Sequence, residues 1–170
     1  FEHIERAVNS AGVSSSRSGS PRETAHGDDA GDGAHMAETV GDHVLQRLRE
    51  WGVEQVFAYP GDGINGIVAA FGKADDSPAF IQARHEEMCA LQAVGYAKFS
   101  GKVGVCLATS GPGAIHLLNG LYDAKLDHVP VVAIVGQTER SAMGGSYQQE
   151  VDLQALLKDV ASEYLVGQRL

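Results

Sequence analysis

This 170-residue sequence lacks clustered cysteines, basic runs and long apolar segments, and each absence excludes a class of protein. The two cysteines, Cys89 and Cys106, form neither a C-x-x-C pair nor a metal-binding spacing, so we expect two buried, reduced thiols. Lysine and arginine total 13 against 22 acidic residues. The net charge of −9, without a basic cluster, argues against nucleic acid and anionic membranes as partners. No apolar run approaches the ~20 residues that a membrane span needs.

The remaining composition is that of a folded domain. The apolar fraction is 44% and the charged fraction 21%, and the length suffices for one α/β domain with its own core. Residues 1–35 differ, because they are rich in Ser, Gly, Asp and His without a sustained apolar period. We expect that segment to be disordered or non-native, and residues 36–170 to form the domain. Since the N-terminus lacks the apolar core of a signal peptide, we expect a cytoplasmic location.

Strands and helices are predicted to alternate from residue 38 onward. Helical apolar spacing or position predicts helices over 38–51, 64–73, the segment that begins near Glu86, 114–126 and 151–159. Short apolar runs predict strands over 56–59, 79–83, 102–109 and 130–135, with a fifth over 163–166. This alternation predicts an α/β fold, a doubly wound, mostly parallel sheet with helices on both faces. The apolar, β-branched strand 130–135 is expected to be buried on both faces.

Glu86 stands out as the candidate functional group. It opens a predicted helix and shares one helical stripe with three small residues, at positions i, i+4, i+7 and i+11; these are Ala90, Ala93 and Ala97. A neighbouring stripe holds Met88, Leu91, Gly95 and Phe99. The small-residue stripe predicts that another element approaches this helix closely, with the acid at its end. In a parallel sheet, functional groups gather in loops at the carboxyl ends of strands, where Glu86 falls.

Two glycine-rich turns leave alternatives open. Residues 61–66 match G-x-G-x-x-G between a strand and a helix, which is the dinucleotide fingerprint, but the following strand ends at Arg84 rather than at an acid. Only an NADP-binding variant would fit, and a tight turn that requires glycine is the simpler interpretation. The turn 110–113, S-G-P-G, would suit an anion at a helix start or a close backbone contact. Neither a Walker lysine nor G-x-S-x-G is present.

Metal ligation is not expected on the sequence evidence. His85 adjoins Glu86, but no second histidine follows at helical spacing. His116 and His128 lie on other predicted elements. The prediction is therefore that these residues bind no metal.

Several short motifs, in their order and spacing, resemble one family. They are Tyr59-Pro60-Gly61, Arg84-His85-Glu86, Ala108 to Gly113, Asn119-Gly120-Leu121, Asp123-Ala124, Val129-Pro130-Val131 and Gly136-Gln137. The family is that of pyruvate oxidase and acetolactate synthase, which are thiamine-diphosphate enzymes, and the resemblance covers the N-terminal pyrimidine-binding domain over about residues 38–166. The stretch 120–130 is more similar to pyruvate oxidases. A G-D-G begins at Gly61, but the asparagines of a magnesium-diphosphate motif do not follow it.

The resemblance implies roles for matching residues. Glu86 would share a proton with N1′ of the cofactor's aminopyrimidine, which favours the imino form that deprotonates the thiazolium C2. The other cofactor-binding residues would be Tyr59, Pro60, Gly61, Thr109, Gly111 and Gly113. Gln137 and Gln149 would lie near the substrate. The family commonly has Phe-Gln-Glu around Gln149, but residues 148–150 here read Gln-Gln-Glu. Because the expected phenylalanine is missing, the resemblance does not identify the substrate.

The resemblance also implies an enzyme larger than this chain. It would decarboxylate a 2-oxo acid such as pyruvate and pass the enamine to a flavin or quinone, as an oxidase does, or to a second 2-oxo acid, as a synthase does. Thiamine diphosphate would be the cofactor, Mg²⁺ and the diphosphate would bind a C-terminal domain, and FAD would be used in a flavin-dependent member. Dimers or tetramers would share active sites between subunits. The chain is thus expected to be an inactive fragment, with a non-catalytic dimerising or regulatory module as the alternative.

Overall fold

A single parallel sheet forms the centre of the structure. The computed structural model describes residues 39–163, so the expectations for residues 1–35 and for most of the fifth strand lie outside the described residues. Its strands are β1 (Gln55–Ala58), β2 (Ala79–Gln82), β3 (Gly104–Ala108) and β4 (Val131–Val135). All neighbouring strands are parallel, in the order β2-β1-β3-β4. The predicted α/β class with a parallel sheet is confirmed.

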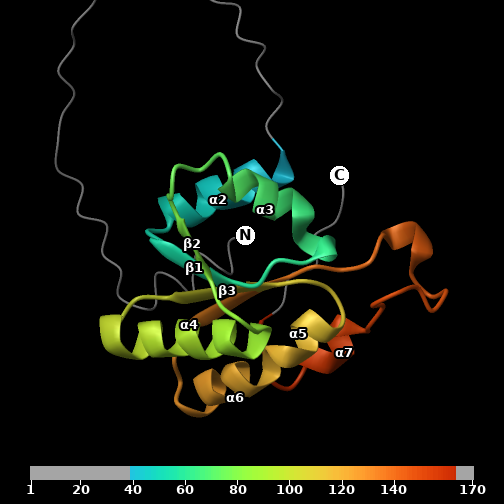
Figure 1. Cartoon of the computed structure of the whole chain (residues 1–170). Coiled ribbons are helices and arrows are strands. Elements are labelled where there is room, and N and C mark those ends of the chain that lie inside the picture. Colours follow the sequence, from blue (N-terminus) through green and yellow to red (C-terminus); the bar gives the residue numbers. More distant parts are fainter. Residues whose placement is uncertain (1–38, 164–170) are drawn as a thin grey trace, which may run out of the picture.

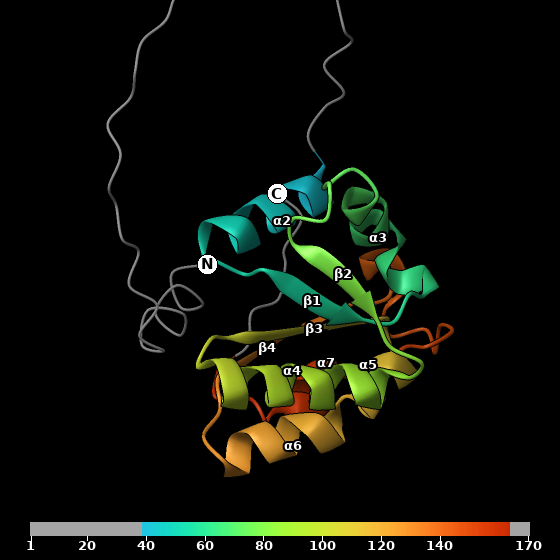
Figure 2. The same cartoon turned by 60° about the vertical axis from the view of Figure 1, so that its left-hand side comes forward.

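Helices cover both faces of the sheet, as predicted (Figure 1). On one face lie α2 (Val40–Glu50) and α3 (Asn65–Phe71), and on the other lie α4 (Glu86–Ser100), α5 (Pro112–His116) and α6 (Leu118–Leu126). The turned view in Figure 2 keeps the same division. Short elements complete the chain: η1 (Asp62–Ile64), η2 (Arg140–Ala142) and α7 (Leu153–Leu157). Within residues 39–163, no helix has the length and apolarity needed to cross a membrane.

Strand alternation divides the interior into two cores. Val56 and Ala58 of β1 belong to the core beneath α2 and α3, and Phe57 between them belongs to the core beneath α4. In β3, Leu107 and Cys106 divide in the same way. Successive side chains of a strand point to opposite faces, so a continuous apolar strand serves both cores.

The expectation that strand 130–135 is buried on both faces is wrong. All five residues of β4 are only half-buried, and β4 ends the strand order of the described sheet. Apolar, β-branched composition reports that a strand packs against helices, but it does not distinguish a central strand from an edge strand.

The expected helix 114–126 is two helices. α5 already begins at Pro112, whose fixed φ and missing N–H suit a first helical position. Leu117, fully buried, joins α5 to α6. The expected helix 151–159 is shorter, at Leu153–Leu157.

Both cysteines are buried and unpaired, as predicted, and we expect them to be unreactive. Burial, with a further contribution from the Glu86 charge, raises the pKa of Cys89 to about 11, and burial raises the pKa of Cys106 to about 12. At pH 8, on the order of one Cys89 thiol in a thousand would be ionised, and the thiolate is the reactive form.

A disulfide reagent should therefore label the two cysteines of the folded chain at least 100-fold more slowly than those of the urea-unfolded chain. Equal rates would contradict this burial.

Candidate functional site

Glu86 is the first residue of α4, and local signals explain why the helix begins there. His85 is its N-cap, in extended conformation, and its Nδ1 accepts a hydrogen bond from the Glu87 backbone N–H at 3.3 Å. Glu86 and Glu87 place negative charge in the first turn, which the helix dipole favours. The helix ends at Ser100, and the C-cap residue Gly101 has a φ of 70°, which suits glycine.

The small-residue stripe of α4 performs the predicted role. Ala90, Ala93 and Ala97 are buried, and two glycines approach this part of the helix. A Cβ on Gly120 of α6 would lie 2.5 Å from the Ala90 Cβ, and one on Gly104 of β3 would lie 2.1 Å from the Ala93 carbonyl oxygen. Neither contact tolerates a side chain. Small residues on both sides therefore hold α4 tightly between the sheet and α6.

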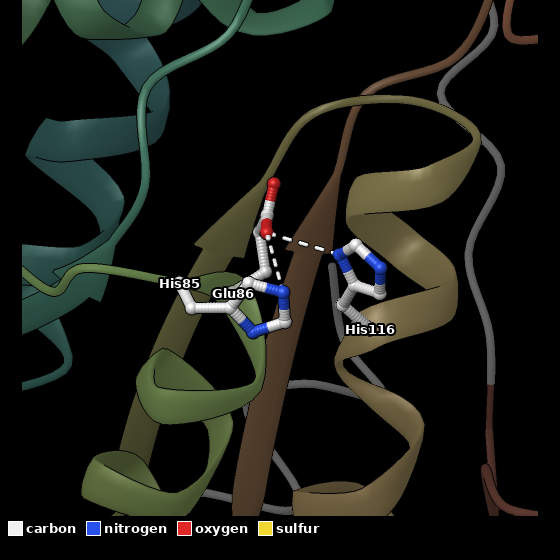
Figure 3. Close-up of side chains that lie close together, drawn as sticks. All are labelled: His85, Glu86 and His116. Atoms are coloured by element: carbon white, nitrogen blue, oxygen red, sulfur yellow. Dashed lines mark hydrogen bonds and ion pairs between the residues drawn. The ribbon is translucent and has the colours of Figure 1, made fainter.

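Glu86 is withdrawn from solvent although it carries a carboxyl group. The residue is only 8% exposed. Its Oε2 lies 3.1 Å from Nδ1 of His116 and 3.9 Å from Nε2 of His85 (Figure 3). The other oxygen, Oε1, would be 3.5 Å from a Cβ placed on Gly113, so the carboxyl group lies over the glycine turn that follows β3. A buried carboxyl group held by a hydrogen bond is suited to exchange a proton with a ligand.

The loops after β1 and β3 meet at the carboxyl edge of the sheet. These are neighbouring strands whose chains leave in opposite directions, β1 toward β2 and β3 toward β4. Such a switch point is where ligands bind in open α/β sheets. Thr109, 7% exposed, accepts a hydrogen bond on Oγ1 from the Gly63 N–H at 3.0 Å, and a Cβ on Gly61 would lie 2.6 Å from its Cβ. The two loops therefore pack without room for larger residues.

A third segment, the loop containing Gln149, reaches the same edge. Gly111 has φ 60° and ψ −115°, which only glycine adopts readily, and a Cβ there would lie 2.5 Å from the Gln149 carbonyl oxygen. The buried Ser110 hydroxyl donates to Gln149 Oε1 at 3.2 Å. Gln149 itself has φ 63°. Gln149, which was predicted to lie near the substrate, therefore contacts the glycine turn that follows β3.

The other predicted residues lie around this edge with less direct contacts. Gln137, after β4, donates from Nε2 to the Val151 carbonyl oxygen at 3.1 Å, which fastens the 137–151 loop at its two ends. The N–H of Tyr59 donates to the Leu107 carbonyl oxygen at 3.2 Å, and its side chain lines an open hollow with Gln82, Ala83 and Arg84. Pro60 is exposed. A second open hollow, lined by Gly144, Ser146, Tyr147, Glu150 and Asp152, lies on the loop, and neither hollow includes Glu86.

Sequence reasoning missed two residues of this site. His116 ends the short helix α5 and hydrogen-bonds Glu86, although 30 positions separate them. Ser110 is buried and bonded to Gln149. The available signal was that both S-G-P-G and Glu86 follow strands of one sheet, but strand order and helix placement were needed to bring the side chains together.

Comparisons with known proteins show which sequences this chain is similar to. The family model described as "Thiamine pyrophosphate enzyme, N-terminal TPP binding domain" matches residues 38–156. A putative thiamine pyrophosphate-containing protein, YdaP, of Bacillus subtilis is 48% identical over 124 residues, which are 73% of this chain and 22% of that protein. Pyruvate oxidase of Lactiplantibacillus plantarum is 44% identical over 72% of this chain and 20% of its own length. Acetolactate synthase isozyme 2 large subunit of Escherichia coli is 47% identical over 66% and 20%. The chain thus spans about a fifth of these relatives.

Proposed function

This chain belongs to the thiamine pyrophosphate enzyme family through its N-terminal TPP-binding domain, and from that premise we propose that Glu86 binds the aminopyrimidine ring of thiamine diphosphate. The observation that carries the proposal is the carboxyl group of Glu86, a residue only 8% exposed, at a helix start and above the glycine turn of the switch point. A desolvated carboxyl group can share a proton with a ring nitrogen more strongly than one in water. The cofactor, when bound, would supply the nucleophilic carbon that attacks a 2-oxo acid.

The residues around Glu86 fit such a ring. At Gly61 and Gly111 a Cβ would meet Thr109 and Gln149, and Gly113 leaves space beneath Glu86 Oε1. Tyr59, Pro60 and Thr109 surround the same edge. In the proposal these residues shape the pyrimidine pocket and keep water from the carboxyl group, and His116 holds Glu86 Oε2 so that Oε1 remains for the ring nitrogen. Gln137 and Gln149 would border the substrate.

We propose that this chain is the N-terminal domain of a longer protein, whose substrate is pyruvate or a similar 2-oxo acid. One relative is named as a pyruvate oxidase and another as an acetolactate synthase, at 44% and 47% identity. The carbon unit left after decarboxylation would therefore be either oxidised, with flavin or quinone taking the electrons, or joined to a second 2-oxo acid. The motif likeness at 120–130 supports the oxidase. FAD belongs to the proposal only in the flavin-using case, and Mg²⁺ with the diphosphate would bind a different domain.

A shared active site between two copies of the longer protein is proposed as well. Large apolar side chains remain exposed on the helices beside Glu86: Met88, Leu91 and Phe99 of α4, Ile115 of α5, and Tyr122 and Leu126 of α6. Phe99 is 94% exposed. Exposed apolar groups of this size are typical of surfaces that a partner covers. These exposed apolar side chains would equally suit the alternative, a non-catalytic dimerising module. The other alternative, an NADP-binding Rossmann domain, has no support from the family assignment.

Restoring cofactor to the longer protein tests this function. After removal of bound cofactor, release of CO₂ from pyruvate should require both thiamine diphosphate and Mg²⁺. The 170-residue chain alone should bind thiamine diphosphate weakly in titration calorimetry, with a Kd on the order of 1 mM or more, because the diphosphate would contribute little there. Micromolar binding by the chain alone would contradict the division of the site between domains, and CO₂ release without the cofactor would contradict the function.

A further inference from the structure

His85, Glu86 and His116 bring three metal-binding side chains to one point, although sequence reasoning predicted no metal at these residues. Each offers one ligand atom, and these atoms all lie within 4.8 Å of one another. Figure 3 shows the Glu86 carboxyl group linked by a dashed line to each of the two imidazoles, one from the start of α4 and one from the end of α5. The two rings lie with their centroids 4.4 Å apart.

The ligand set and the spacing match a divalent transition metal. Two histidines and one glutamate form a common three-ligand zinc set that leaves one position for water. With metal–ligand bonds of 2.0–2.1 Å, tetrahedral ligand atoms lie about 3.4 Å apart. The distances from Glu86 Oε2 to His116 Nδ1 and His85 Nε2 are 3.1 Å and 3.9 Å. The ligand atoms of the third pair, His85 and His116, lie within 4.8 Å of each other, so rotation of the two exposed imidazoles would close the set around one ion.

The three side chains are exposed to solvent in a way that would let a metal ion reach them. The His85 and His116 side chains are 46% and 42% exposed, and the Glu86 side chain is 11% exposed. An ion can enter from solvent on the histidine side and be held by a mostly buried carboxylate. Binding through His85 Nε2 places a proton on Nδ1, so His85 gives up the 3.3 Å N-cap bond to Glu87.

We propose that this triad binds Zn²⁺ or a similar divalent transition metal, and that the metal competes with the aminopyrimidine for Glu86. The competition rests on the proposed function, since one carboxyl group cannot serve both ligands fully. By linkage, the metal lowers affinity for the cofactor by the same factor as the cofactor lowers affinity for the metal. The site would thus act as an inhibitory metal site on the cofactor pocket.

Cobalt titration of the 170-residue chain, without cofactor, tests the metal site. Co²⁺ bound by the triad should give the intense visible absorption of a four-coordinate complex, and Zn²⁺ should displace it. His116→Asn and Glu86→Gln should each weaken Co²⁺ binding at least 10-fold. His128→Asn is the matched control: His128 has φ 54°, which asparagine tolerates, and the triad does not include it. This variant should bind as the wild type does.

Equal affinity of the wild-type chain and His116→Asn would overturn the site, because other residues of the chain would then account for binding. Circular dichroism of each variant separates loss of a ligand from loss of the fold. In the longer protein, Zn²⁺ should raise the Kd for thiamine diphosphate in the wild type and not in His116→Asn. If Zn²⁺ binds without raising the Kd for thiamine diphosphate, the metal site stands and only the proposed competition is wrong. Failure of the cobalt site would leave the cofactor assignment intact.

Discussion

Glu86→Gln, made in the longer protein, is expected to slow solvent exchange of the thiazolium C2 proton of bound thiamine diphosphate by at least about 100-fold. The amide keeps the size of the side chain and can still hydrogen-bond, but it cannot share a proton with the ring nitrogen. Because the Glu86 carboxyl group is nearly withdrawn from water, solvent cannot readily replace it. Hydrogen–deuterium exchange at C2, followed by NMR after acid quench, measures the effect directly.

The matched control is the adjacent acid. Glu87→Gln changes the same functional group in the same helical turn, but Glu87 accepts a hydrogen bond from Asn119 at 2.6 Å and does not contact His116 in the described contacts. Its exchange rate should stay within about twofold of the wild type, since the change lies away from the ring nitrogen. Exchange at the wild-type rate in Glu86→Gln would remove this carboxyl group from the mechanism.

Gly104→Ala is expected to lower the free energy of unfolding of the chain by about 3 kcal/mol. The added Cβ would lie 2.1 Å from the Ala93 carbonyl oxygen and 2.7 Å from its carbonyl carbon. These are backbone atoms of α4, so relief requires that the helix move away from β3. Movement of α4 also displaces Glu86 at its first turn. The loss is measured by urea unfolding followed by circular dichroism.

Gly95→Ala is the same substitution at another glycine, but it is expected to raise the free energy of unfolding instead of lowering it. Gly95 lies within α4, and a Cβ there would meet no atom within 4 Å. Alanine should therefore stabilise the chain by about 0.5–1 kcal/mol, because glycine loses more backbone freedom on folding. If Gly104→Ala unfolded at the wild-type urea concentration, the close contact between β3 and α4 would be wrong.

Local sequence pattern predicted some features of the fold correctly, and the helix that begins at Glu86 is one of them. Helical spacing of Glu86 with Ala90, Ala93 and Ala97 correctly predicted a buried, small-residue stripe, because spacing along one helix depends on the backbone alone. Strand and helix alternation likewise predicted the parallel α/β class. By contrast, the composition of β4 led to the wrong expectation of full burial, because neighbours across the sheet are not encoded in a single strand.

Local periodicity, glycine turns and short ordered motifs by themselves determined the fold class, the position of Glu86 at a helix start and the family to which the chain is similar. Only the tertiary structure decided that β4 ends the described sheet, that Leu117 divides one expected helix in two, and that His116 meets Glu86 across 30 positions. The physical reason is the sequence separation between the residues that interact. Helical hydrogen bonds and helical stripes follow from neighbouring residues, whereas contacts between α4 and α5 arise only after both helices pack on the same face of the sheet.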